Sequence, residues 1–470
     1  MRVKVLLYNP KSVFYTMPLG LLAIASQLDP QRYEVIIVDG RLEQEPVKAL
    51  QPHLSEAVCL GVSVLTGRPI RDALRVTRAI KQLVPRLPVV WGGWHPSLFA
   101  TACLEEPAID VTVQAQGETT FREIVERLAG GESVVGIAGC TCRDGVKVLQ
   151  NPPRPMRDMN EFTPANYDLL PVARYFKLKR EKQLDYVSSA GCYFRCTFCA
   201  DPFVFQRKWT ALKPQRMGEE LEDLWRRYRF DDLHLQDETY FTYRQRVTAV
   251  AEEFLRRGLK FTWTATMRAD QGTRMADEEF ALCKRSGLRR VLIGVESGSQ
   301  AMLKWMKKDI TIEQIFTAAE RCLRYDVAVD FPMIVGFPDE PEESVWETLA
   351  IAKRLRAMSP KFKTQIFFYQ PYPGSPIAEA VRAKGYLMPQ TLDEWADFDF
   401  VGSYGPWVSK EKKLLVERFK FFSRHAWDDQ PGWLRRPLQR LANWRCARDV
   451  YAVPVEKWLV DLLQPRPQLS

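Results

Sequence analysis

The sequence GCYFRCTFCA at positions 191–200 is the most informative stretch of this chain. Its three cysteines, Cys192, Cys196 and Cys199, are separated by three and then by two residues. Three thiolates on one short loop can bind three irons of a four-iron cubane, which otherwise takes four cysteines. No fourth cysteine lies nearby, because the next one is Cys283. The loop therefore predicts a cluster with one iron left open to another ligand, as catalytic metal sites keep an open position.

A zinc knuckle that lacks a ligand, or a chance grouping, is the alternative interpretation of these cysteines. Zinc sites favour a Cys-x2-Cys pair joined by a second pair or by histidines. Cys140 and Cys142 would be the partners for such a site, but they lie in a different predicted domain. The cluster interpretation is the one that we carry forward.

The cysteines follow the first strand of a long alternation of strands and amphipathic helices. About six strand–helix units predict a partial or full β/α barrel, with its site at the carboxyl ends of the strands. The expected strands lie near residues 186–189, 232–236, 261–265, 291–295, 329–335 and 364–368.

The N-terminal part alternates in the same way, which predicts a Rossmann-like doubly wound parallel sheet. Such sheets bind ligands at the carboxyl ends of their strands. The predicted fold class is therefore α/β, a Rossmann-like domain followed by a partial, TIM-like β/α barrel and a helical C-terminal extension. The expected boundaries are 1–135 for the first domain, 136–183 for a proline-rich linker, 184–390 for the barrel and 391–470 for the extension.

Composition excludes several classes of protein. With 46% hydrophobic and 27% charged residues, the 470-residue chain is typical of globular proteins. Its apolar runs are too short for a transmembrane helix, and its first residues lack the core of a signal peptide, so we expect a cytoplasmic protein. The net charge of +9 is concentrated in residues 405–470, which hold 13 Lys and Arg against 7 Asp and Glu. This local excess does not predict a nucleic-acid-binding protein.

Residues 405–470 also carry five of the 13 tryptophans. A basic and aromatic helical segment is typical of peripheral contact with a membrane surface. A lid over a large apolar substrate and a helical cap packed on the barrel fit the same pattern, and all three stay open.

The cysteine spacing resembles that of the radical S-adenosylmethionine (SAM) enzymes. The resemblance implies that Cys192, Cys196 and Cys199 hold a [4Fe–4S] cluster and that SAM binds its open iron through amino and carboxylate groups. It further implies that an electron, from a donor such as flavodoxin or ferredoxin, cleaves SAM to a 5′-deoxyadenosyl radical.

The same resemblance assigns SAM contacts to several strand ends. Asp237 and Glu238 resemble the acidic pair that binds the SAM amino group, with a solvated helix cap as the alternative. Glu296 and Ser297 match the element that contacts the ribose and carboxylate. Phe198 and a turn that contains Gly336 and Pro338 are implied to lie near the adenine. Arg268 is the last implied contact.

The N-terminal domain resembles the cobalamin-binding modules that precede many radical SAM domains. The matching elements supply Ser63 and Leu65, then Gly92, Gly93 and His95, then Gly117 and Glu118. Glycines let the nucleotide tail of the cofactor approach the backbone closely. The chain departs from the pattern at Arg41, which stands where a cobalt-ligating histidine is expected and has no lone pair to give. The alternative for the whole domain is a Rossmann-like domain that binds no corrin. The alternative for His95 is a histidine that serves only the structure of its loop.

Together the two domains predict a cobalamin-dependent radical SAM enzyme that methylates an unactivated carbon of a small hydrophobic substrate. A radical SAM cyclase or rearrangement enzyme of tetrapyrrole or lipid biosynthesis is the second hypothesis. A non-catalytic sensor that binds a corrinoid or a cluster is the third.

Overall fold

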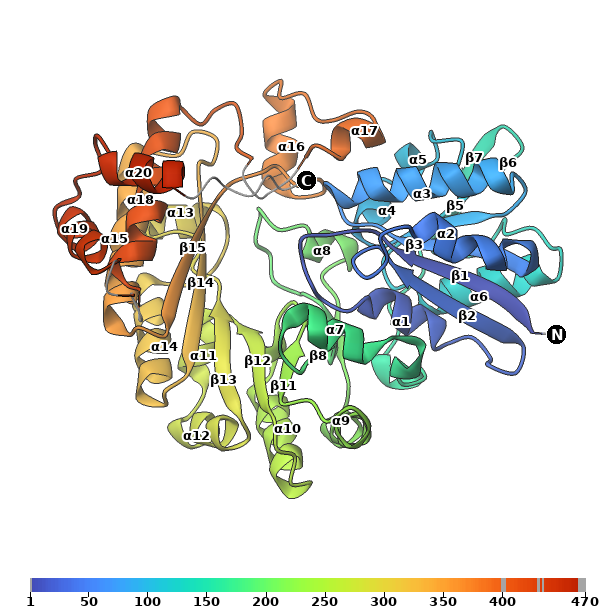
Figure 1. The fold of residues 1–470 in the computed structure, drawn as a ribbon, viewed down its shortest axis with the longest axis horizontal. Helices are drawn as coiled ribbons and strands as arrows, with labels where there is room; N and C mark the ends of the chain where they lie inside the picture. The colour runs from blue at the N-terminus through green and yellow to red at the C-terminus, as the bar shows by residue number, and fades with distance from the viewer. Residues whose placement is uncertain (1, 399–402, 429–431, 433–434, 464–470) are drawn as a thin grey trace. The chain divides into compact units, whose positions relative to one another are not determined.

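The computed structural model describes residues 2–398, 403–428, 432 and 435–463. The chain forms two compact units, each built from two segments (Figure 1). The first unit contains Met1–Ala265 and Pro371–Asp399, and the second contains Thr266–Gln370 and Phe400–Ser470.

A seven-stranded sheet with the order β2-β1-β3-β4-β5-β6-β7 organises the N-terminal part. The first five strands along the chain pair in parallel, with Val5 opposite Val35 and Ser63 opposite Gly92. The strands are β1 (Val3–Asn9), β2 (Tyr33–Asp39), β3 (Ala57–Ser63), β4 (Val89–Gly92), β5 (Val111–Val113), β6 (Cys140–Asp144) and β7 (Lys147–Gln150).

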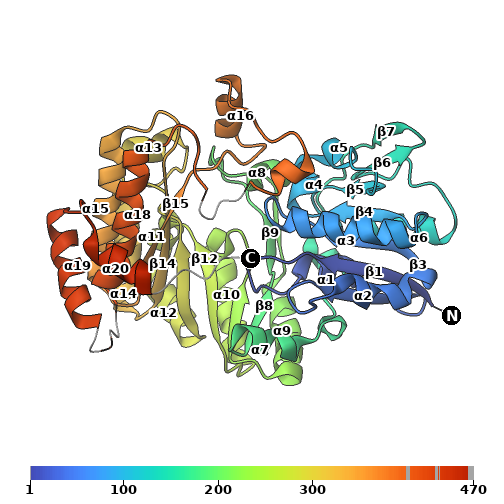
Figure 2. The ribbon, with the colours of Figure 1, turned by 45° about the horizontal axis from the view of Figure 1, so that its top comes forward.

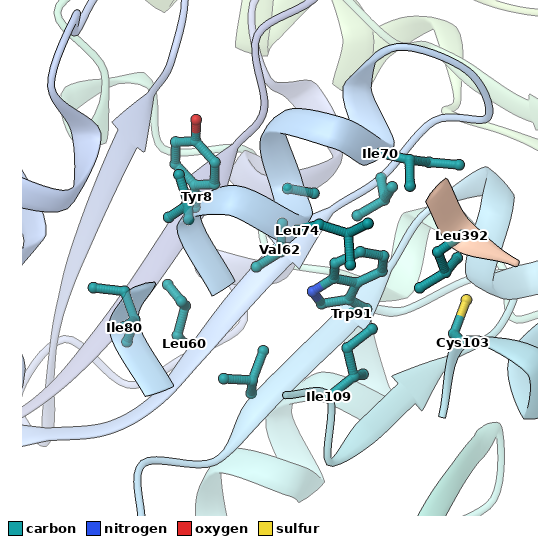
Figure 3. Close-up of a cluster of buried hydrophobic side chains, with 14 of the residues drawn as sticks. Tyr8, Leu60, Val62, Ile70, Leu74, Ile80, Trp91, Cys103, Ile109 and Leu392 are labelled. Carbon is teal, nitrogen blue, oxygen red and sulfur yellow. The ribbon is translucent and has the colours of Figure 1, made fainter. Parts of the chain in front are cut away.

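Helices cover both faces of this sheet because its strand residues alternate between two apolar cores. Leu6 and Tyr8 of β1 face one core, while Val5 and Leu7 face the other. Trp91 lies fully buried within the first core (Figure 3). The helices of this region are α1 (Leu19–Ala25), α2 (Pro46–Leu50), η1 (Gln51–Glu56), α3 (Pro69–Leu83), α4 (Trp94–Leu98), α5 (Ala100–Cys103) and α6 (Glu118–Ala129).

Part of the stretch predicted as a linker, 136–183, is folded into this sheet. β6 pairs antiparallel with β5, and β7 pairs antiparallel with β6. The sheet is therefore doubly wound and parallel over five strands, with an antiparallel hairpin at one edge. The rest of the stretch contains η2 (Met159–Glu161), η3 (Tyr167–Leu169) and α7 (Val172–Lys179).

A second sheet of six strands has the order β15-β14-β13-β12-β11-β8, which confirms the predicted partial barrel. β8 and β12 flank β11 in parallel, and β13 and β15 flank β14 in parallel. The strands are β8 (Gln183–Tyr186), β11 (Asp232–Leu235), β12 (Thr262–Met267), β13 (Leu288–Ile293), β14 (Ala328–Val335) and β15 (Phe362–Phe368).

Helices follow the strands of this sheet. The sequence at the start of α14 forms a capping box: the Thr311 hydroxyl accepts a hydrogen bond from the Gln314 amide, and the Thr311 amide donates to the Gln314 side-chain oxygen. These helices are α9 (Pro214–Tyr228), η4 (Tyr240–Thr242), α10 (Arg244–Arg256), α11 (Ala269–Arg274), α12 (Asp277–Arg285), α13 (Gln300–Trp305), α14 (Ile312–Arg324) and α15 (Glu342–Met358).

The segment after β15 divides between the two units. Leu392 and Trp395 of α17 join the first core beside α3, whereas the helices after residue 403 belong to the second unit. No helix in the described residues is long and apolar enough to cross a membrane. The helices are α16 (Pro376–Ala383), α17 (Leu392–Trp395), α18 (Lys410–Ala426), α19 (Arg436–Arg448) and α20 (Val455–Leu463).

Candidate cluster and cofactor sites

The cysteine loop starts where the short strand β9 (Ser189–Gly191) ends beside β10 (Trp209–Ala211), its antiparallel partner. Gly191 has a φ of 83°, and a Cβ there would lie 2.3 Å from the Lys208 carbonyl oxygen, so the turn requires glycine. The structure describes all ten cysteines, of which eight are buried. The two that are half-buried, Cys192 and Cys199, both lie in this loop.

The environment of the three thiols fits a bound cluster. Burial raises the pKa of the Cys199 thiol well above its ordinary value, and the Asp201 carboxylate raises it further, with smaller effects from Cys196 and Cys192. The Cys192 and Cys196 sulfurs therefore lie close enough to Cys199 to disfavour its thiolate form. Iron ions would supply the positive charge that stabilises thiolates in such a loop.

No three His, Cys, Asp or Glu side chains in the described part of the chain converge on a single ion position. A cubane does not need such convergence, because each cysteine binds a different iron. Phe198, predicted to lie near the adenine, is half-buried within the loop.

Asp237 holds the base of the loop in place. Its carboxylate accepts hydrogen bonds from the Ser188 amide at 2.7 Å and from the hydroxyls of Ser188 and Ser189 at 2.6 Å each. Asp237 is 1% exposed. These three bonds give it a positioning role for the segment that leads into the cysteines, and its contact with SAM stays a prediction.

Glu238, the second member of the acidic pair, is placed differently. Burial raises the pKa of its carboxyl group well above the ordinary value, and the negative charge of Asp201 adds to the effect. Burial also raises the pKa of Asp201 to about 6. The Asp201 carboxylate lies 3.7 Å from the Cys199 sulfur. Sequence reasoning missed Asp201, although its position two residues after Cys199 was a usable signal.

In the second unit, Glu296 is clamped to β14 in the left-handed conformation, with a φ of 62°. Its amide donates to the Pro332 carbonyl, and its own carbonyl accepts from the Ile334 amide at 2.7 Å. Its buried carboxylate pairs with the Lys308 ammonium at 2.7 Å. A non-glycine residue held in this conformation is typical of functional sites. Lys308, which sequence reasoning missed, neutralises that charge.

Ser297 and Arg268, which are also predicted to contact SAM, form hydrogen bonds with other residues of the protein. The Ser297 hydroxyl accepts from the Ser299 amide at 3.1 Å and is fully buried. Arg268 donates from Nε to Asp270 at 2.9 Å and from its terminal nitrogen to the Lys308 carbonyl at 2.5 Å. Their contacts with SAM stay predictions.

The turn that begins at Gly336, with Pro338 half-buried in it, is braced by the C-terminal segment. The Trp407 indole donates to the Gly336 carbonyl at 2.7 Å, and the Lys412 ammonium donates to the Glu340 carbonyl at 3.1 Å. Gly336 has a φ of 76°, and a Cβ there would lie 2.8 Å from Val408. Sequence reasoning missed this brace, since nothing in the local sequence pairs residue 407 with residue 336.

In the first unit, five of the predicted cobalamin residues line one cavity of about 190 Å³: Ser63, Gly92, Gly93, Gly117 and Glu118. Small side chains make this space. Added Cβ atoms at Gly92 and Gly117 would point toward Val113, at 3.7 and 3.4 Å. Gly93 requires glycine because of its φ of 97°. A slot cleared by glycines fits the nucleotide tail that the resemblance places here.

Arg41, Leu65 and His95 do not line this cavity. Leu65 is 40% exposed. The Arg41 guanidinium forms a two-pronged ion pair with Asp39 and donates to the Phe14 carbonyl at 2.7 Å. Arg41 is thus held by its own network in this structure, and its position beneath a corrin stays a prediction.

His95 is fully buried and packs against the rings of Phe99 and Trp395. Its Nδ1 lies 3.2 Å from the Thr66 hydroxyl. Burial lowers the pKa of His95 from 6.5 to about 3, so the folded protein holds the neutral imidazole. The geometry is that of a core histidine.

This burial predicts a pH-dependent stability. The unfolded chain takes up a proton on His95 below pH 6.5 while the folded chain does not, so stability is complete above pH 6.5 and falls as the pH decreases toward 3. We expect His95 to account for a loss of about 1 kcal/mol between pH 6.5 and 5.5. Urea unfolding of the wild type and His95→Phe at both pH values measures it. An identical pH dependence in the two proteins would contradict the assignment.

Comparisons with known proteins identify both domains. Residues 186–352 match the family model of the radical SAM superfamily, and residues 6–125 match that of the B12 binding domain. An uncharacterised methyltransferase of Pyrococcus horikoshii is 28% identical over 410 residues, which cover 85% of this chain and 86% of the relative. An anaerobic magnesium-protoporphyrin IX monomethyl ester cyclase of Rubrivivax gelatinosus is 26% identical over 68% of this chain and 59% of its own length.

Solved structures share the fold. The radical SAM methyltransferase TsrM of Kitasatospora setae, with cobalamin and a [4Fe–4S] cluster bound, superposes with a TM-score of 0.69 at 18% identity, covering 83% of this chain and 76% of its own. The cobalamin-dependent SAM radical enzyme OxsB with aqua-cobalamin bound gives a TM-score of 0.74 at 17% identity, covering 99% and 75%.

Fold and sites thus define a class of enzyme that joins a B12-binding domain to a radical SAM domain. The chain belongs to the radical SAM enzymes that carry a B12-binding domain. The cofactors of this family are a [4Fe–4S] cluster, SAM and cobalamin.

Proposed function

We propose that this enzyme transfers a methyl group to an unactivated carbon of a small hydrophobic substrate. The observation that carries the proposal is that one chain contains both a three-cysteine loop and a glycine-cleared slot in its B12-binding domain. When bound, the cluster and SAM supply a radical that removes a hydrogen atom, and cobalamin supplies the methyl group.

The residues of the chain have separable tasks in this proposal. Cys192, Cys196 and Cys199 hold the cluster, and Asp237 fixes the start of their loop through Ser188 and Ser189. Glu238 binds the SAM amino group. Because burial keeps the Glu238 carboxyl protonated more readily than usual, a cationic ammonium beside it would favour the charged form.

An aromatic row in the second unit supports a hydrophobic substrate. Phe337 follows β14 and Tyr369 follows β15, and their rings stack with centroids 4.5 Å apart. Trp305 contacts Phe337 at one end of the row, and Trp407 contacts Tyr369 at the other. Phe337 and Tyr369 are buried, so the exposed Trp305 would offer the aromatic surface of this row to an apolar or planar ligand.

An anaerobic assay tests the proposal. The reconstituted protein is incubated with SAM, dithionite, hydroxocobalamin and a panel of polyprenoids, lipids and tetrapyrroles. We expect bound corrin, 5′-deoxyadenosine, S-adenosylhomocysteine and a methylated product that carries deuterium from methyl-deuterated SAM. Protein that binds corrin but forms neither nucleoside would contradict the proposal and favour a sensor.

Oxidative cyclisation without methyl transfer is the second candidate function, because cyclases are among the relatives. It predicts 5′-deoxyadenosine and bound corrin without S-adenosylhomocysteine, and a product that has lost hydrogen instead of gaining a methyl group.

The Trp407 brace gives a further expectation. Trp407→Phe removes the hydrogen bond to the Gly336 carbonyl and keeps an aromatic ring. We expect SAM affinity to fall by about fivefold, since a neutral hydrogen bond contributes about 1 kcal/mol. Equilibrium binding of SAM measures this, with corrin binding, which should not change, as the control. Unchanged SAM affinity would place the Gly336 turn away from SAM.

A further inference from the structure

The second unit contains a cavity of about 610 Å³ that neither cofactor occupies in the assignments above. It lies along residues 363–367 of β15, the edge strand of the six-stranded sheet, and is lined on its other side by α18. Figure 2 shows α18 beside β15 and α15, which it contacts. None of the residues predicted to bind SAM, the cluster or cobalamin lines this cavity.

Positive charge dominates its lining. The cationic residues are Arg356, Lys363, Lys420, Arg424 and Arg435, against the single carboxylate of Asp428. Arg356 is buried and donates to the Trp427 carbonyl at 2.5 Å, which links α15 to the end of α18. Lys420 pairs with Glu417 at 2.8 Å.

The other three cations have no ion-pair partner among the residues that the structure describes. Among the described residues, the side chains of Lys363, Arg424 and Arg435 form no ion pair and no hydrogen bond. They come from three separate segments: β15, α18 and the residue that precedes α19. All three residues are exposed, and all three border the same cavity. Such an arrangement matches the oxygens of a phosphate group.

The remaining lining is suited to an amphipathic anion. Ile366 and Phe419 are buried and form an apolar floor, and Trp427 adds an aromatic wall. The buried Ser423 also lines the cavity. The half-buried His425 experiences the positive field: burial lowers its pKa, and Arg424 and Arg435 lower it further, against an opposing effect of Asp428.

We propose that this cavity binds the phosphate group of an anionic ligand, with Lys363, Arg424 and Arg435 as its contacts. The site is independent of the radical chemistry. A phosphate of this kind comes either from a soluble phosphoester or from the headgroup of an anionic lipid, and the two sources share the same contacts.

His425 provides a direct test. The chain has four histidines, so histidine-labelled protein gives few imidazole signals to follow by NMR. We expect pyrophosphate to raise the pKa of His425, because an anion between Arg424 and Arg435 offsets their charges, and to leave His53, His95 and His234 unchanged. No change at His425 with millimolar pyrophosphate would overturn the proposal.

Two variants of α18 form a matched pair. Arg424→Gln removes a cavity cation, while Arg418→Gln removes the same charge from the same helix outside the cavity. We expect pyrophosphate to bind about tenfold more weakly to Arg424→Gln, since one charge-assisted hydrogen bond is lost, and normally to Arg418→Gln. Equal effects of both variants would mean non-specific attraction and would overturn the site. Arg435→Gln serves as a second cavity variant.

Vesicles distinguish the two sources. Sedimentation of the full chain with phosphatidylglycerol vesicles, with phosphatidylcholine vesicles as the reference, measures lipid binding. Binding that pyrophosphate displaces and that Arg424→Gln weakens assigns the site to a lipid headgroup. Pyrophosphate binding without vesicle binding assigns it to a soluble phosphoester.

Discussion

Replacing Cys196 with alanine is expected to abolish the absorption of the iron–sulfur cluster and all cleavage of SAM. Cys196 is buried in the centre of the loop, between the half-buried Cys192 and Cys199. A loop with two cysteines cannot hold three irons of a cubane. Anaerobic reconstitution followed by absorption spectroscopy and measurement of 5′-deoxyadenosine checks both effects.

The control for this experiment is Cys322→Ala. Cys322 is fully buried in α14, so the substitution makes a similar small void without touching the cysteine loop. It should retain the cluster and SAM cleavage. SAM cleavage that persists in Cys196→Ala would reject the cluster assignment.

Lys308→Met should destabilise the folded protein strongly. It removes the partner of the Glu296 carboxylate, and both residues are less than a tenth exposed. Breaking a buried ion pair by removing one partner costs about 3 to 5 kcal/mol, because an uncompensated charge stays behind. Equilibrium unfolding in urea measures the loss.

A double-mutant cycle separates this charge effect from packing. Glu296→Gln removes the carboxylate, and Glu296→Gln combined with Lys308→Met should be more stable than Lys308→Met alone. If the double variant is no more stable than the single one, the loss comes from packing around Lys308 and the ion pair contributes little.

Local patterns predicted the parts of the fold that depend on neighbours in sequence. The strand expected near residues 232–236 is observed as β11 (Asp232–Leu235), and the alternation of strands and helices correctly predicted both sheets. The hairpin of β6 and β7 was missed because proline-rich sequence follows it closely, and the stretch as a whole looked like a linker.

Site residues at strand ends could also be predicted from the sequence, whereas contacts between distant parts of the chain could not. Ser63, Gly92 and Gly117 were expected together and do line one cavity, since each follows or ends a strand of the same sheet. The surroundings of His95 could not be predicted, because Trp395 reaches it from 300 positions further along the chain. The same holds for the contact between Trp407 and Gly336.

The return of residues 371–399 to the first unit has a consequence for biosynthesis. Leu392 and Trp395 complete the core that surrounds Trp91, yet they leave the ribosome long after the strands of that core (Figure 3). The N-terminal domain therefore waits, incompletely covered, until the whole barrel has been translated.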